Sequence, residues 1–129
     1  MRLLLDTHVA IWALIAPERL SPAVRDHIGA PANSVFVSAA SIWEIAIKHA
    51  LGRRGRPPFS GADAFAYFRE AGYMLLPVTA EHAAAVESLP PLHTDPFDRL
   101  LVAQARSEPL WLVTADPMVV AYDSNVIAT

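Results

Sequence analysis

The sequence has 129 residues, a length at which one domain buries about two-thirds of the surface of the unfolded chain. Hydrophobic residues make up 53% of the sequence and the mean hydropathy is +0.31, which excludes a disordered tail. The lack of cysteine excludes disulfides and cysteine-ligated zinc and favours a reducing cytoplasm. The net charge of −3 argues against an ordinary nucleic-acid binder, unless a bound cation supplies the missing positive charge.

Short apolar runs alternate with helical patterns along the whole chain. In chain order, the patterns predict a strand over 2–5, helices over 7–17 and 22–29, a strand over 34–38, helices over 39–52 and 62–72, a strand over 73–78, helices over 80–89 and 97–106, a strand over 110–113, a helix over 116–122 and an edge strand over 124–127. Good N-cap residues precede four of the helices: Ser21, Ser38, Thr79 and Asp95. Gly52 is a candidate C-cap.

This alternation defines the expected fold class. Short, continuously apolar strands are typical of a parallel sheet that is buried on both faces. We therefore expect a single three-layer α/β domain over residues 1–129, with a central, mostly parallel sheet of four or five short strands. No membrane span is expected, because the longest uncharged stretch, residues 27–43, contains glycine, proline, asparagine and serine. The apolar run before Asp6 is too short for a signal peptide.

Four acidic residues map to one edge of the predicted sheet. Asp6 ends the first strand, Asp116 follows the fourth, Glu44 lies on the helix after the second, and Asp98 lies in the first turn of the helix before the fourth. Ligands of open parallel sheets bind beyond the carboxyl ends of the strands. Clustered carboxylates repel each other unless a cation compensates, and oxygen ligands suit Mg²⁺ or Mn²⁺. The pattern therefore predicts a divalent-metal site that activates water.

Structural roles are alternatives for several of these residues. Asp6 is also suited to a turn or cap, Glu44 to an ion pair with Lys48 four residues later, and Asp116 to a helix cap before Pro117. Three histidines are expected not to bind metal, because their spacings match no metal motif: His8, His49 and His93.

Asp95 and Asp98 lie three residues apart and need separate interpretations. Pro96 suits the first helical position, which makes Asp95 the N-cap and Asp98 the third helical residue. The apolar positions 97, 100, 101 and 105 form the core-facing stripe, and Asp98 borders its N-terminal end, where the strand tips lie. We therefore expect Asp98 to be the metal ligand and Asp95 the cap.

Four segments together resemble the PIN-domain nucleases: "LLLDTHVAIWAL", "SAASIWEIAIKHALG", "HTDPFDRLLVAQA" and "LVTAD". They are most similar to the VapC-type toxin subgroup with an HxDPFDR stretch. The resemblance implies a ribonuclease that uses one or two Mg²⁺ or Mn²⁺ ions, is usually dimeric and is inhibited by an antitoxin encoded beside it. The family's acids fall on Asp6, Glu44, Asp98 and Asp116, while Asp95 belongs to the subgroup motif.

Other residues are candidates for supporting roles. Thr7 and Thr114 carry hydroxyls beside the site and are candidate contacts to water or metal, with turn capping as the alternative. Arg99, Arg53 and Arg54 are candidate contacts to RNA or an antitoxin. Arg53 and Arg54, together with Arg56 and Lys48, form a candidate phosphate-binding patch, although it is expected at the end of the helix far from the acids. Aromatic residues beyond the expected capacity of the core predict a dimer face or an antitoxin groove: Trp12, Trp43, Phe65 and Phe68.

Three further functions are weighed against this interpretation. An acid-cluster phosphotransferase is disfavoured, because a haloacid-dehalogenase-like enzyme would need an acid at position 8, which is His8, and a receiver domain would need paired acids before the first helix. A catalytically silent PIN-like scaffold is disfavoured by the four intact acids. A PIN nuclease of RNA processing without any antitoxin is indistinguishable from a toxin by sequence.

Overall fold

The computed structural model describes residues 1–122 and 125–129. The strands are β1 (Arg2–Leu5), β2 (Ser34–Ser38), β3 (Met74–Leu76), β4 (Trp111–Thr114) and β5 (Val126–Ala128). The helices are α1 (Thr7–Ile15), α2 (Pro22–Gly29), α3 (Ala39–Leu51), α4 (Gly61–Glu70), α5 (Ala80–Ala85), α6 (Pro96–Ser107) and α7 (Pro117–Val120), with single 3₁₀ turns at Pro17–Arg19 and Val86–Ser88.

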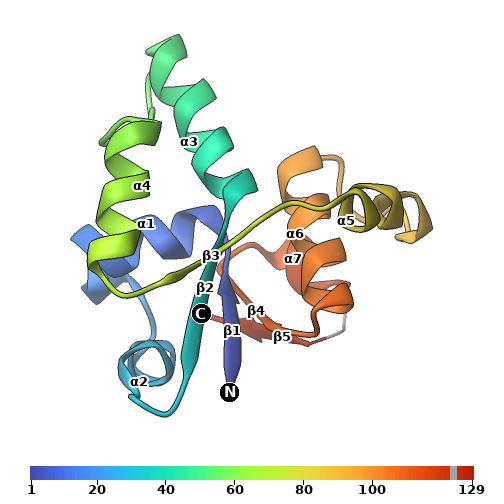
Figure 1. Cartoon of the computed structure of the whole chain (residues 1–129), viewed down its shortest axis with the longest axis horizontal. Coiled ribbons are helices and arrows are strands. Elements are labelled where there is room, and N and C mark those ends of the chain that lie inside the picture. Colours follow the sequence, from blue (N-terminus) through green and yellow to red (C-terminus); the bar gives the residue numbers. More distant parts are fainter. Residues whose placement is uncertain (123–124) are drawn as a thin grey trace.

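The strands form one parallel sheet in the order β3-β2-β1-β4-β5. Helices α1 to α4 lie on one side of the sheet and α5 to α7 on the other, so the molecule has three layers, as expected (Figure 1). The central strand β1 contributes side chains to the hydrophobic core on each side of the sheet, because successive side chains point to opposite faces. Leu3 and Leu5 lie in one core and Leu4 in the other.

The register of the sheet determines which residues meet at its carboxyl edge. Leu5 pairs with Val37 on one side and with Val113 on the other. The residues that follow these three positions are Asp6, Ser38 and Thr114, so the chain segments leaving β1, β2 and β4 start side by side. This edge is where the sequence predicts the functional site.

Local capping explains most helix boundaries. Ser21 and Ser38 accept hydrogen bonds from the backbone N–H groups of Val24 and Ala40, and Gly52 ends α3 in the left-handed conformation with φ of 64°. Ser60 caps α4, which therefore begins at Gly61, one residue before the predicted start. The predicted edge strand 124–127 corresponds to β5, and its residue 124 lies outside the described residues.

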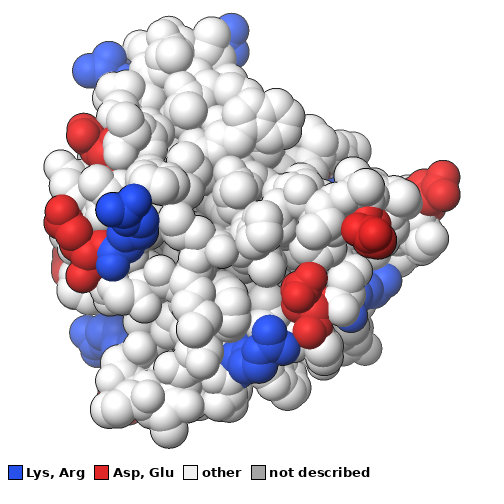
Figure 2. All heavy atoms as spheres, in the orientation of Figure 1, with Lys and Arg blue, Asp and Glu red and all other residues white. Residues whose placement is uncertain are grey.

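The expected surplus of aromatic residues is only partly at the surface. Trp43 is 59% exposed and Phe65 is 43% exposed, but Phe68 is completely buried and Trp12 is half-buried. The expectation for Phe68 is wrong, because α4 turns this side chain into the core beside β1. On the face shown in Figure 2, charged side chains lie singly or in small groups with wide uncharged areas between them. No helix in the described part of the chain is long and apolar enough to span a membrane.

Candidate metal centre

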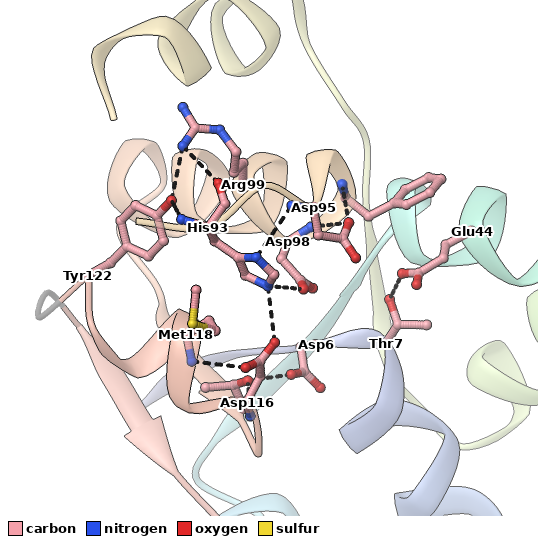
Figure 3. A network of polar contacts seen from close by, with 12 residues as sticks. Asp6, Thr7, Glu44, His93, Asp95, Asp98, Arg99, Asp116, Met118 and Tyr122 are labelled. Carbon is pink, nitrogen blue, oxygen red and sulfur yellow. Dashed lines mark hydrogen bonds and ion pairs between the residues drawn. The ribbon is translucent and has the colours of Figure 1, made fainter. Parts of the chain in front are cut away.

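Three of the four predicted acids lie at helix N-termini at the carboxyl edge of the sheet. Asp6 is the N-cap of α1 and Asp116 the N-cap of α7, while Asp98 lies in the first turn of α6. Glu44 lies further along α3, and Figure 3 shows its carboxylate turned back toward Thr7 at the start of α1. Local helix-capping geometry and sheet topology together therefore collect the four acids at one end of the fold.

Asp98 and Asp116 meet across a histidine. The Nε2 atom of His93 lies 2.9 Å from Oδ2 of Asp98 and 3.1 Å from Oδ2 of Asp116 (Figure 3). In the described residues, these three side chains form a group whose candidate ligand atoms all lie within 4.8 Å of one another. His93, which the sequence predicts not to bind metal, therefore lies at the site, with its ring between two of the predicted acids.

Hydrogen bonding indicates the tautomer of His93. The backbone N–H of Asp95 donates to Nδ1 of His93 over 3.3 Å, so Nδ1 acts as an acceptor. A neutral imidazole with Nδ1 as acceptor carries its proton on Nε2. The Nε2–H group is then a donor directed at Asp98 and Asp116, and it is not available as a metal ligand in this tautomer. We infer that His93 orients the two carboxylates.

Arg99 fixes the loop that carries His93. Its guanidinium donates to the carbonyl oxygens of Pro90, His93 and Val86 and to the hydroxyl of Tyr122, at 3.0 to 3.3 Å. The same Tyr122 hydroxyl accepts the backbone N–H of His93 at 3.1 Å. Because both terminal nitrogens of the guanidinium are engaged in this way, we assign Arg99 a structural role in place of the expected contact with RNA or an antitoxin.

Asp6 is buried and held by hydrogen bonds. Its Oδ1 accepts the backbone N–H of Val9 at 2.9 Å, and its Oδ2 accepts the hydroxyl of Thr114 at 2.5 Å. Thr114 Oγ1 also accepts the backbone N–H of Asp116 at 3.0 Å. Burial raises the pKa of Asp6, although these hydrogen bonds oppose the change. Thr114 thus connects two of the acids and restricts their orientation.

Glu44 lies on the other side of the site, and both oxygens of its carboxylate contact other side chains. Thr7 donates to Oε1 at 2.6 Å, and the Lys48 ammonium lies 2.5 Å from Oε2. Burial alone would lower the pKa of Lys48, but the hydrogen bond to Glu44 and the charges of Glu44, Asp95 and Asp98 raise it. Glu44 can therefore reach a cation through Oε2 only if Lys48 releases that oxygen.

The residues present fit a hard divalent cation. Burial, followed by the negative charges of Asp95, Asp6 and Glu44, raises the pKa of Asp98 to about 7. This crowding of carboxylates is what a divalent cation would relieve, and carboxylate oxygens are the ligands that Mg²⁺ and Mn²⁺ prefer. Asp98 and Asp116 are placed to hold such an ion, with Asp6 beside them in the hollow that also contains Asp116.

Asp95 acts as the sequence predicts. Its side chain accepts the backbone N–H groups of Phe97 at 2.8 Å and Asp98 at 3.4 Å, and it is the N-cap of α6. These bonds hold its Oδ1 at the helix terminus, and Asp95 is not a member of the group formed by His93, Asp98 and Asp116. The two aspartates of the motif therefore have different environments.

The basic residues after α3 separate into two groups. Arg53 and Arg54 line a hollow with Ile47 and Leu51 at the C-terminal end of the helix, away from the acids. The loop that follows folds back, and Arg56 also lines the cleft that contains Glu44. The sequence predicts that all three arginines lie far from the acids, whereas the structure brings Arg56 into the cleft that contains Glu44.

Variants of His93 test whether this side chain orients the two carboxylates for metal binding. His93→Ala removes the donor that orients Asp98 and Asp116, and we expect the Mn²⁺ affinity to fall by about tenfold, the typical cost of losing such a hydrogen bond beside a metal. His93→Gln places an amide N–H near the position of Nε2 and should keep the affinity within about threefold of the wild type. Isothermal titration calorimetry measures both, with His27→Ala on α2 as the control. Equal affinities for all three variants would contradict the orienting role.

The chain belongs to the PIN domain family, because the family model of the PIN domain matches residues 3–124. A comparison with curated proteins finds no match. Among solved structures, the fold is similar to VapBC2 from Rickettsia felis bound to a promoter DNA fragment, at 16% sequence identity and a TM-score of 0.70, covering 100% of this chain and 98% of that one.

Two further structures show the same fold. FitAcB from Neisseria gonorrhoeae is 23% identical, with a TM-score of 0.58 and coverage of 97% of this chain and 96% of that one. VapC20 from Mycobacterium tuberculosis, a toxin that cleaves the sarcin–ricin loop, is 19% identical, with a TM-score of 0.61 and coverage of 92% and 93%. The resemblance to PIN domains and the predicted three-layer fold are thus confirmed, while membership of the HxDPFDR subgroup stays a prediction.

Proposed function

We propose that this protein is a divalent-metal-dependent ribonuclease that hydrolyses RNA phosphodiester bonds, with residues 1–129 forming its single domain. The observation that supports this proposal best is the pair Asp98 and Asp116, held together across His93 and close to Asp6 at the carboxyl edge of a PIN-domain sheet. Crowded carboxylates, which raise the pKa of Asp98 to about 7, favour a functional site over a catalytically silent scaffold.

The acids and their hydrogen-bonding neighbours have different parts in the proposed reaction. A divalent cation bound at the site would activate water and neutralise charge on the phosphate. Asp98 and Asp116 would hold the ion, and the Asp6 carboxylate would lie beside it. The Thr114 hydroxyl fixes the orientation of the Asp6 carboxylate by a hydrogen bond. Glu44, paired with Lys48, adds negative charge on the opposite side and orients Thr7. We propose Asp6, Glu44, Asp98 and Asp116 as the active-site acids.

We further propose that the protein acts in the cytoplasm as the toxin of a toxin–antitoxin pair and forms a homodimer. This is supported by the fold shared with a toxin–antitoxin complex from Klebsiella pneumoniae and with the toxin VapC20. Trp43, which is 59% exposed on α3, is an apolar surface that a second copy or the antitoxin could cover. An RNA-processing nuclease without an antitoxin is the alternative, and a small partner gene beside this one would decide between them.

The experiment that tests the proposed activity compares metals. Purified protein is incubated with a panel of structured RNAs in Mn²⁺, in Mg²⁺ and in EDTA, and the products are resolved on sequencing gels. We expect discrete internal cuts with either metal and none in EDTA. Intact RNA in all three conditions, with a folded protein by circular dichroism, would contradict the proposal. Light scattering on the same sample checks the expected dimer.

A further inference from the structure

A second cavity adjoins the acids on the side of Glu44. It is a cleft of about 360 Å³ between α1, α3 and the loop after α3, and its wall includes Thr7 and Glu44 at the acidic end. What the cleft could bind follows from the charge and aromatic character of its other lining residues.

Three cations line this cleft. Arg19 follows α1, Lys48 lies on α3, and Arg56 lies on the folded-back loop. Lys48 is paired with Glu44, whereas the structure pairs neither Arg19 nor Arg56 with a carboxylate anywhere in its described residues. Both arginines are exposed at the surface of the molecule. In a protein with a net charge of −3, two unpaired guanidinium groups in one cleft indicate an anionic ligand.

Aromatic rings connect the cleft to the acids. His8 and Trp12 line the cleft and also the neighbouring hollow of about 290 Å³ that contains Asp6 and Asp116. Their ring centroids lie 5.9 Å apart with the planes tilted by 46°, and Arg19 lies 4.4 Å from the centroid of Trp12. A chain leaving the metal site can therefore cross these rings and enter the cleft. Flat rings beside cations are what single-stranded nucleic acids use for stacking.

We propose that this cleft binds the RNA nucleotide next to the scissile phosphate, with Arg19 and Arg56 contacting its phosphate and His8 and Trp12 stacking on its base. The inference rests on the proposed ribonuclease function, because it makes the cleft an extension of that site. An acidic peptide would also meet the arginines, but it would not use the rings that lead to Asp6 and Asp116. RNA accounts for both features.

Binding without cleavage is the direct test. Fluorescence anisotropy in EDTA measures the affinity of a labelled ten-nucleotide single-stranded RNA for the wild type, Arg19→Gln and Arg56→Gln. Each variant should bind about 3- to 10-fold more weakly, with a salt slope reduced by about one. Arg25→Gln on α2 removes the same charge away from the cleft and should stay within about twofold of the wild type. In cleavage assays the KM of the two cleft variants should rise while kcat stays unchanged.

The outcomes separate this inference from the proposed activity. Unchanged affinity and KM in both cleft variants would overturn the nucleotide subsite even if the wild type cleaves RNA. Weaker binding by the variants, together with no cleavage by the wild type in any metal, would support the subsite and contradict the nuclease. Polyaspartate serves as a second probe. If the two cleft variants lose affinity for polyaspartate but bind RNA as tightly as the wild type, the cleft binds an acidic peptide and the inference is overturned.

Discussion

Replacing Asp98 with asparagine is expected to reduce metal-dependent RNA cleavage by about 100-fold or more while leaving the fold intact. Asp98 is one of the two carboxylates held across His93, and the amide keeps the shape of the side chain but removes the charge that would bind a cation. Mn²⁺ affinity, measured by calorimetry, should fall with the activity. Cleavage by Asp98→Asn at a rate close to the wild type would contradict the assignment of this residue.

Asp95→Asn is the matched control for this variant. Asp95 lies three residues earlier in the same motif, but its carboxylate is bonded to the N-terminal N–H groups of α6. Asparagine caps helices about as well as aspartate, so the unfolding free energy should change by only a few tenths of a kcal/mol. Cleavage should remain within about threefold of the wild type. If Asp95→Asn alone abolished cleavage in a folded protein, the roles of the two aspartates would be reversed.

The sequence predicts well those features that depend on local rules. Strand β1, helix α2 and strand β2 begin and end at the predicted residues, because apolar runs, a serine cap and a proline at the first helical position determine them locally. Asp95 as cap and Gly52 as C-cap follow from the same rules. Asp6 and Asp116 reach one edge because parallel strands put their carboxyl ends there.

Features that depend on how loops fold back could not be predicted from the sequence. His93 is part of the site because Arg99 binds the loop carbonyls and Tyr122, a residue 29 positions further along the chain than His93. Metal-motif spacing cannot detect such an arrangement, since the histidine precedes α6 and faces residues from two separate elements. The only sequence signal is its place in the "HTDPFDR" stretch. Arg56 was expected far from the acids for the same reason, because its place in the sequence beyond the end of α3 does not show that the loop reverses direction.

The stability of the metal-free protein is expected to fall as the pH rises from about 4 to about 8. The pKa of Asp98 is raised from 3.8 to about 7, so the folded state binds a proton that the unfolded state has released. This contribution is fully present below the unfolded pKa and is lost as the pH rises through about 7. Three pKa units correspond to about 4 kcal/mol as an upper limit, and we expect an observed loss of about 1–3 kcal/mol. Asp6, whose pKa is also raised by burial, changes stability in the same direction.

Urea unfolding in EDTA between pH 5 and pH 8 measures this loss, and two comparisons identify its source. Asp98→Asn cannot ionise, so its stability should depend less on pH, and at pH 8 it should be more stable than the wild type by about 1–3 kcal/mol. Millimolar Mn²⁺ at pH 8 should stabilise the wild type and not this variant, because binding to the folded state alone adds stability. If the wild type and Asp98→Asn showed the same dependence of stability on pH in EDTA, Asp98 would ionise without cost. In that case the carboxylates are not crowded, and the main structural argument for a cation at this site fails.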